Sequence, residues 1–129
     1  MIVDSSALVA VAVAESRSGW VLDHLAAAGG ACIGGPTLVE VCLVLIGRFG
    51  PGGRGMASRL VEKTKLVTVA FEASHAAAAA DAFLRFGKGR HPARLNYGDC
   101  MTYAVAKLAG EPLLCVGEDF AKTDLELAG

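Results

Sequence analysis

Short apolar segments alternate with longer helix-forming segments along this chain, and the alternation restricts the possible folds more than any other feature. The segments with strand character are residues 1–4, 31–34, 66–70 and 113–116. The helical patterns cover residues 7–14, 19–28, 36–49, 56–63, 72–86 and 97–109, and a glycine-rich break at residues 50–55 interrupts them. Strands that are separated by helices predict a mostly parallel sheet with helices on both faces.

The length and composition predict one domain. A chain of 129 residues with 53% hydrophobic residues and a mean hydropathy of +0.48 can bury a real core, so we expect residues 1–129 to form a single domain. Charged residues interrupt every apolar stretch before it reaches the roughly 18 to 20 residues of a membrane span. The chain also carries Asp4 where a secretory signal would carry basic residues. We therefore expect a cytoplasmic protein without membrane contact.

An acid is unexpected at four positions, which are Asp4, Glu40, Asp99 and Asp119. Asp4 and Asp119 follow expected strands, and ligands of parallel α/β sheets bind beyond the carboxyl ends of the strands. Glu40 interrupts an apolar run, and Asp99 opens an expected helix. Carboxylates that converge in a low-dielectric cleft repel one another unless a cation neutralises them, and oxygen ligands favour Mg²⁺ or Mn²⁺. Such metal sites belong to nucleases and other phosphoryl-transfer enzymes.

Asp4 and Glu40 each have a purely structural alternative. Asp4 could cap the helix that follows it. Glu40 could form a buried salt bridge with Arg48 or Arg59. The pattern predicts a helix that is apolar on nearly all faces around Glu40, where a lone carboxylate costs several kcal/mol unless it is paired or bound to metal.

Asp99 and Asp119 have structural alternatives as well. Asp99 lies three residues after Asn96, so it could belong to a helix start and lie near the positive end of the helix dipole. Asp119 shares its loop with Glu118, and an acidic loop after a strand is often solvated surface. The combination of the four acids therefore carries the inference, rather than any single acid.

The cysteines and histidines do not indicate a zinc site. The four cysteines lie singly in apolar surroundings without the paired short spacings of zinc ligands, so we expect buried, reduced thiols. The three histidines also stand alone, and we expect them to be surface or packing residues. The formal net charge of −1 decides nothing about nucleic acid, because an acidic pocket can cancel a basic binding face.

Four segments resemble the VapC toxins of bacterial toxin–antitoxin pairs, which are PIN-domain ribonucleases. These segments are Ile2–Leu8, Thr37–Val41, Leu95–Ala106 and Pro112–Asp124. They occur in a consistent order, and the last two are specific enough to make chance agreement improbable. The resemblance implies a three-layer α/β/α fold, a divalent metal, cleavage of RNA, inhibition by a partner antitoxin and a homodimer.

The resemblance also implies roles for individual residues. The acidic quartet of the family is matched by Asp4, Glu40, Asp99 and Asp119, which would hold Mg²⁺ or Mn²⁺. Ser6 matches the small hydroxyl residue beside the first acid, and Asp124 matches a further acid that often lies near the pocket. The expected reaction is hydrolysis of RNA phosphodiester bonds by metal-activated water, which leaves a 5′-phosphate and a 3′-hydroxyl. Ser6 would orient water or a carboxylate and would not attack phosphorus.

A basic segment precedes the helix that carries Asp99. It contains Arg85, Lys88, Arg90 and Arg94, a density that suits contacts with RNA phosphates near the scissile bond. The same residues could instead contact the antitoxin, whose binding segments in this family often insert into the active-site groove, or could form a solvated loop.

Two other classes of protein fit parts of the pattern. A receiver-type signalling domain has a similar length and an acidic pocket, but it needs an aspartate at the end of its third strand, and residues 66–70 end without one. It also gives Glu40 no role. A catalytically silent binding module on the same fold is the second alternative, and the presence of all four acids argues against it.

Overall fold

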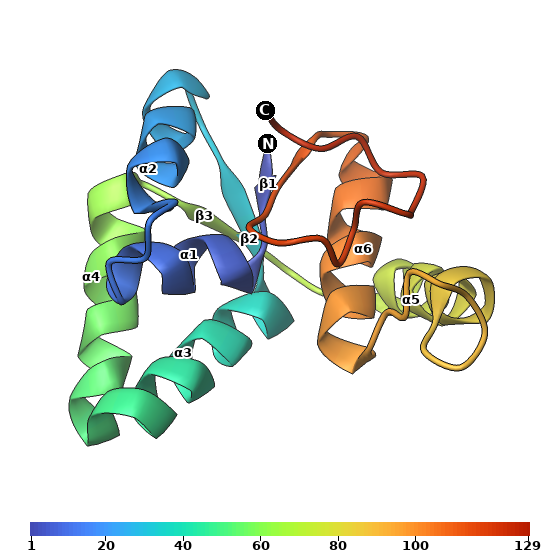
Figure 1. The fold of residues 1–129 in the computed structure, drawn as a ribbon, viewed down its shortest axis with the longest axis horizontal. Coiled ribbons are helices and arrows are strands. Elements are labelled where there is room, and N and C mark those ends of the chain that lie inside the picture. Colours follow the sequence, from blue (N-terminus) through green and yellow to red (C-terminus); the bar gives the residue numbers. More distant parts are fainter.

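A parallel sheet forms the centre of the computed structural model, which describes residues 1–129. Its strands are β1 (Ile2–Val3), β2 (Cys32–Gly34), β3 (Val67–Val69) and β4 (Leu113–Leu114). Their order in the sheet is β3-β2-β1-β4, and all neighbours run parallel (Figure 1). Strands from opposite ends of the chain, β1 and β4, therefore end side by side, and so do the residues that follow them.

Helices cover both faces of this sheet (Figure 1). They are α1 (Ser5–Ala12), α2 (Ser18–Ala27), α3 (Gly35–Phe49), the 3₁₀ turn η1 (Gly50–Gly52), α4 (Gly53–Thr64), α5 (Ala73–Phe86) and α6 (Tyr97–Ala109). The first four α-helices pack on one face, and α5 packs with α6 on the other. The prediction of a mostly parallel sheet between two helical layers is confirmed.

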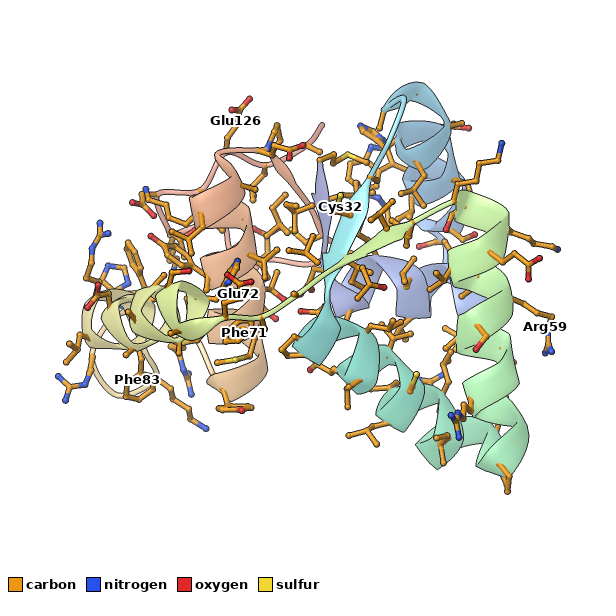
Figure 2. The ribbon with its side chains drawn as sticks, turned by 180° about the vertical axis from the view of Figure 1, so that it is seen from behind. Cys32, Arg59, Phe71, Glu72, Phe83 and Glu126 are labelled. Atoms are coloured by element: carbon orange, nitrogen blue, oxygen red, sulfur yellow. The ribbon has the colours of Figure 1, made fainter.

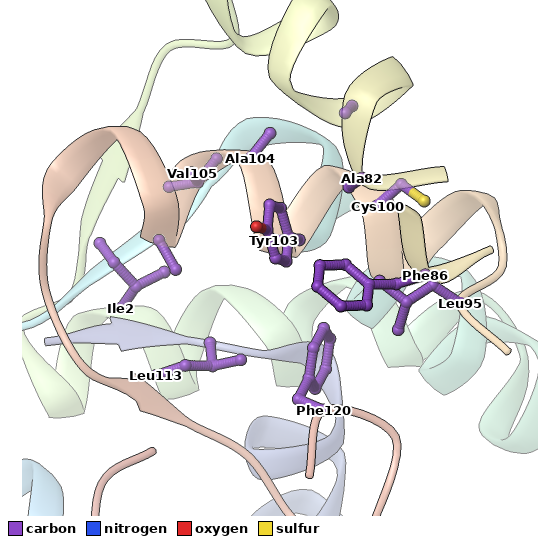
Figure 3. Close-up of a cluster of buried hydrophobic side chains, with 12 residues drawn as sticks. Ile2, Ala82, Phe86, Leu95, Cys100, Tyr103, Ala104, Val105, Leu113 and Phe120 are labelled. Atoms are coloured by element: carbon purple, nitrogen blue, oxygen red, sulfur yellow. The ribbon is translucent and has the colours of Figure 1, made fainter. Parts of the chain in front are cut away.

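The strands β1 and β4 each supply side chains to both cores, because successive side chains of a strand point to opposite faces. In β1, Ile2 belongs to the core beneath α5 and α6, whereas Val3 belongs to the core beneath α1 to α4. Leu113 and Leu114 divide in the same way in β4. Figure 3 shows the first of these cores, in which Phe120 from the C-terminal segment closes the cluster.

Most expected elements occur with boundaries that differ by a few residues. The helix Tyr97–Ala109 matches its expected range, because Asn96 caps its start and Gly110 ends it in a left-handed conformation. The glycine-rich break is shorter than predicted, because α4 already begins at Gly53 rather than at Met56. A β-carbon at Gly53 would lie 2.3 Å from the carbonyl carbon of Leu45, so glycine lets α4 pack closely on α3.

The prediction that α3 is buried on nearly all faces is wrong. The helix buries only the face formed by Thr37, Val41 and Leu45, a spacing of four residues. Leu43 is 63% exposed, and Val39 is 55% exposed. Neighbouring elements contact only one side of α3, so its apolar residues continue onto the surface. No helix in the structure is both long enough and apolar enough to span a membrane.

Candidate active site

Asp4 is the most buried acid of the site, with 5% of its surface exposed. Its Oδ2 atom accepts hydrogen bonds from the Ser6 amide at 3.1 Å and from the Ser6 hydroxyl at 2.6 Å. Its Oδ1 atom accepts a hydrogen bond from Thr102 Oγ1 at 2.8 Å. Asp4 therefore does cap α1, as the structural alternative proposed, and it is also anchored to α6 on the far side of the sheet.

Ser6 connects the ends of the neighbouring strands β1 and β4. Its hydroxyl donates to Asp4 and accepts a hydrogen bond from the amide of Val116 at 3.0 Å. Val116 lies just after β4, so one side chain fixes the first acid relative to the loop that carries Asp119.

Glu40 extends from α3 toward the first turn of α6. Its Oε1 atom accepts a hydrogen bond from the Ser5 hydroxyl at 3.0 Å. A β-carbon at Gly98 would lie 2.9 Å from Oε2 of Glu40, so the carboxylate reaches the start of the helix that carries Asp99. Burial raises the pKa of Glu40 although the Ser5 bond opposes the rise, and the charge of Asp4 adds to it.

The structural alternative for Glu40 is not observed. Glu40 takes part in none of the ion pairs of the chain. Arg59, one of its two proposed partners, points away from the sheet on the outer side of α4 (Figure 2). The carboxylate is therefore held by a hydroxyl and lacks a protein cation.

Asp99 forms a reciprocal cap with Asn96. Its Oδ2 atom accepts from the Asn96 amide at 3.1 Å, and its own amide donates to Oδ1 of Asn96 at 2.9 Å. The structural alternative for Asp99 is thus realised. Burial nevertheless raises the pKa of Asp99 to about 6 against the effect of the Asn96 bond, and repulsion from Asp119, Asp4 and Glu40 adds to the rise. All four expected acids therefore share one electrostatic neighbourhood.

A cleft of about 420 Å³ lies on the Asp99 and Asp119 side of this cluster. Its acidic lining consists of these two residues and Glu118. Its basic lining consists of Lys88, Arg94 and Lys122. The cleft thus places positive side chains within the same cavity as two acids of the quartet, an arrangement suited to a phosphate chain beside a metal site.

Sequence comparison identifies the family. A model of the PIN domain matches residues 1–126. The chain is 49% identical over 130 residues to ribonuclease VapC36 of Mycobacterium tuberculosis, covering 100% of this chain and 94% of the relative. It is 41% identical over 126 residues to ribonuclease VapC of Mycolicibacterium smegmatis, covering 97% of each chain. The chain belongs to the VapC ribonucleases of the PIN-domain family.

Solved structures agree with this fold. VapC20 of Mycobacterium tuberculosis, described as a Sarcin-Ricin loop cleaving toxin, aligns with a TM-score of 0.80 at 18% identity, covering 98% of this chain and 97% of that one. VapBC2 from Rickettsia felis, bound to a DNA fragment from their promoter, aligns with a TM-score of 0.77 at 13% identity, covering 98% and 96%. The three-layer α/β/α architecture of a PIN domain is thereby confirmed.

The donor atoms of this PIN domain fit a hydrated, hard divalent cation. No three acidic, histidine or cysteine side chains are arranged to surround an ion directly. The quartet nevertheless offers only oxygen donors, and neither Glu40 nor Asp99 forms an ion pair with a basic side chain. Mg²⁺ keeps several waters and is commonly bound through one or two carboxylates together with substrate phosphates, which matches this open arrangement.

Asp124, the further acid that the resemblance implied, does not line the cleft of Asp99 and Asp119 and is bonded to residues of α5 and α6. Its Oδ1 atom accepts from the Tyr103 hydroxyl at 2.6 Å, and its Oδ2 atom lies 2.9 Å from Lys107 Nζ and 3.3 Å from Arg85 Nη2. Burial acts to raise its pKa, but the bonds from Tyr103 and Lys107 and the nearby positive charges lower the pKa to about 2. This network ties the C-terminal segment to α5 and α6.

The basic segment divides between several environments. Lys88 and Arg94 line the acidic cleft. Arg85 pairs with Asp124, and the guanidinium of Arg90 lies 5.8 Å from the ring centre of Phe83. Only half of the four expected contact residues therefore lie at the cleft.

Sequence reasoning missed several residues that surround or support the quartet. These are Ser5, Thr37, Gly98, Thr102 and the cleft residue Lys122. Thr102 lies three residues after Asp99 and therefore on the same face of α6, which is a signal that the sequence contained. The other residues carry no comparable local signal.

Proposed function

We propose that this protein is a divalent-metal-dependent endoribonuclease that acts as the toxin of a type II toxin–antitoxin pair. The observation that carries the proposal is that Asp4, Glu40 and Asp119 all act electrostatically on Asp99, from the side of the sheet where β1 and β4 end. Burial is the main cause of the raised pKa of Asp99, repulsion from the other three acids adds to it, and a bound cation would relieve that repulsion. The ribonuclease names of close relatives support the same activity.

The chemistry would combine metal binding with hydrolysis. Mg²⁺ or Mn²⁺ bound by the quartet would activate water and stabilise the charge that develops on phosphorus. The side chains of this protein would prepare the site. Ser6 and Thr102 fix the carboxylate of Asp4, Ser5 fixes that of Glu40, and the N-terminal turn of α6 fixes that of Asp99.

The basic lining of the cleft would bind the RNA backbone. Lys88, Arg94 and Lys122 share the cleft with Asp99 and Asp119. Cationic side chains at this place would hold phosphates next to the scissile bond and release counterions. We propose RNA as the substrate on this basis and on the similarity to VapC20, which is described as cleaving the Sarcin-Ricin loop.

An antitoxin is the proposed protein partner, and a homodimer is the proposed assembly. Structures similar to this chain include a toxin-antitoxin complex from Klebsiella pneumoniae, with a TM-score of 0.73. The exposed apolar residues of α3 and an apolar depression between α5 and α6, which contains Phe71 and Phe83 (Figure 2), support contacts with other chains. Light scattering on the protein with and without a co-expressed small protein encoded directly upstream would test both partners.

Cleavage by the purified, antitoxin-free protein is the decisive test. A structured RNA should be cut in Mg²⁺ or Mn²⁺, and EDTA should abolish cleavage. Replacing any acid of the quartet with alanine should reduce the rate by on the order of a hundredfold or more. Ser6→Ala should reduce it less, because water can partly replace a hydroxyl that orients a ligand. Asp81→Ala, at an exposed acid of α5, is the matched control and should cleave normally.

Metal binding has a readout that does not need RNA. Millimolar Mg²⁺ or Mn²⁺ should raise the melting temperature, and Asp99→Asn should diminish that rise. Full cleavage by Asp99→Ala, or cleavage that persists in EDTA, would reject the metal-nuclease function in favour of a catalytically silent binding module.

A further inference from the structure

The three buried polar side chains of this protein are hydrogen-bonded to one another. They are Asp4, Thr37 and Thr102, with exposed fractions of 5%, 2% and 1%. Thr102 Oγ1 lies 2.8 Å from Oδ1 of Asp4 and 3.0 Å from Oγ1 of Thr37. A buried polar group costs free energy unless it is hydrogen-bonded, so the cost is concentrated at one point of the fold.

Counting protons gives this chain of bonds a direction. An ionised carboxylate only accepts hydrogen bonds, so the single hydroxyl proton of Thr102 is committed to Asp4. In the bond between the two hydroxyls, Thr37 is therefore the hydrogen-bond donor and Thr102 is the acceptor. Thr37 thus donates to Thr102, and Thr102 donates to Asp4. Hydrogen bonds that are linked in this way polarise and strengthen one another.

The chain of hydroxyls joins elements that carry different acids. Thr37 lies in the first turn of α3, one turn before Glu40, and Thr102 lies one turn after Asp99 on α6. The two bonds of Thr102, one to Thr37 and one to Asp4, therefore connect the helix of Glu40, the helix of Asp99 and the residue that follows β1.

The close approach of these elements depends on a glycine at the end of β2. A β-carbon at Gly34 would lie 2.8 Å from Cγ2 of Val105 and 3.8 Å from Oγ1 of Thr37. Val105 follows Thr102 by three residues on α6. Because glycine has no side chain at position 34, α6 can approach the end of β2 closely enough for Thr102 to contact Thr37. Tight backbone packing thus supports the geometry of the hydroxyls.

We propose that Thr102 is a positioning residue, which with Thr37 sets the direction in which the Asp4 carboxylate faces the rest of the quartet. The inference rests on the proposed nuclease function of this site. Ser6 holds one oxygen of Asp4 through a loop, whereas Thr102 holds the other oxygen from the helix of Asp99. The relative orientation of the two aspartates is fixed by this second bond.

Isosteric variants test the role of the hydroxyl. Thr102→Val keeps the shape of the side chain and removes the donor, whereas Thr102→Ser keeps the donor. Thr64→Val is the matched control, because the hydroxyl of Thr64 donates to the carbonyl of Leu60 on α4, away from the quartet. Single-turnover RNA cleavage, RNA affinity in EDTA, the melting temperature and crystal structures would be compared with those of the wild type.

The expected result separates positioning from stability. Thr102→Val should lower the cleavage rate by on the order of tenfold or more while RNA affinity stays within about twofold. Its crystal structure should show the Asp4 carboxylate rotated. Thr102→Ser should restore most of the rate, and Thr64→Val should cleave normally. Thr37→Val should show a smaller loss in the same direction, and it serves as a second variant if Thr102→Val does not fold.

Two outcomes would overturn the positioning role. One is an Asp4 carboxylate that keeps its orientation in crystals of Thr102→Val, which can be observed even if the wild type cleaves no RNA. The other is equal loss of cleavage in the valine and serine variants. An inactive wild type would instead reject the proposed function, so the two failures are distinguishable.

Discussion

The carboxylate of Glu40 lies against Gly98 so closely that a β-carbon at position 98 would stand 2.9 Å from its Oε2 atom and 3.0 Å from its Oε1 atom. Gly98 belongs to the first turn of α6, directly before Asp99. The absence of a side chain at this position therefore allows acids from two helices to approach each other.

Gly98→Ala should lower activity without a matching loss of stability. The added methyl group would push aside the end of the flexible Glu40 side chain, which costs little folding energy but displaces a carboxylate of the site. Alanine in a helix is favoured over glycine by up to about 1 kcal/mol, which offsets part of the contact. We expect cleavage to fall by on the order of tenfold while the melting temperature changes little.

Gly47→Ala provides the matched control for this experiment. Gly47 lies in α3, and a β-carbon there would meet nothing within 4 Å. This variant should keep full activity and gain slightly in stability. Normal cleavage by Gly98→Ala would mean that the position of Glu40 does not matter for the reaction.

The stability of the metal-free protein should fall as the pH rises through about 6. The pKa of Asp99 is raised from 3.8 to about 6, chiefly by burial, so the folded state binds more protons than the unfolded state between these values. The favourable contribution is complete below about pH 4 and is lost as the pH passes the folded pKa. Urea unfolding in EDTA between pH 4 and 8 would measure this slope, and Asp99→Asn should flatten it. A slope that is unchanged in the variant would contradict the assignment to Asp99.

Neutralising cleft cations should weaken RNA binding. For Arg94→Gln combined with Lys122→Gln, we expect a lower affinity for RNA. The plot of log binding constant against log salt concentration should become less steep by roughly 0.7 to 0.9 for each lost phosphate contact. Fluorescence titrations at several salt concentrations would measure both. Arg90→Gln is the control, because this residue lies over Phe83 outside the cleft lining. If Arg90→Gln lost as much RNA affinity as the double variant, the net charge of the protein, rather than the cleft residues, would account for RNA binding.

Asp124→Asn should affect stability and leave cleavage unchanged. The variant loses the charge that accepts bonds from Tyr103, Lys107 and Arg85, at a cost on the order of 1 to 2 kcal/mol at neutral pH. The pKa of Asp124 is lowered from 3.8 to about 2, so this stabilisation is present above about pH 4 and is lost as the pH falls toward 2. Urea unfolding of the wild type and the variant should show a smaller difference in unfolding free energy at pH 3 than at pH 7. A decrease in the cleavage rate of more than tenfold in Asp124→Asn would indicate that Asp124 takes part in the active site.

Local patterns were sufficient to predict α6 and its neighbourhood. The pair Asn96 and Asp99 forms a capping box because both partners lie within one turn, and Gly110 ends the helix because it adopts a left-handed conformation. These interactions depend on residues a few positions apart. The bounds of this helix could therefore be predicted from the sequence, as could the order of strands and helices.

The order of elements also predicted that Asp4 and Asp119 lie near one edge of the sheet, since both follow parallel strands. It did not predict how much of α3 is buried. A helix buries the faces that its neighbours contact, and only packing decides that Leu43 is exposed whereas Leu45 is not. The same holds for Asp124, whose partner Tyr103 is 21 residues away in the sequence.

The sequence by itself determined which acids this protein can bring together, because a carboxylate beside or within an apolar segment is costly to bury unless a cation or a hydrogen-bond donor meets it. Only the tertiary structure decided how those acids are held. Thr37 and Thr102 are ordinary helix residues in the sequence, 65 positions apart, and Thr102 is 98 positions from Asp4. Hydrogen bonds depend on distances of about 3 Å, and such distances between remote residues exist only after α3, α6 and β1 have packed together.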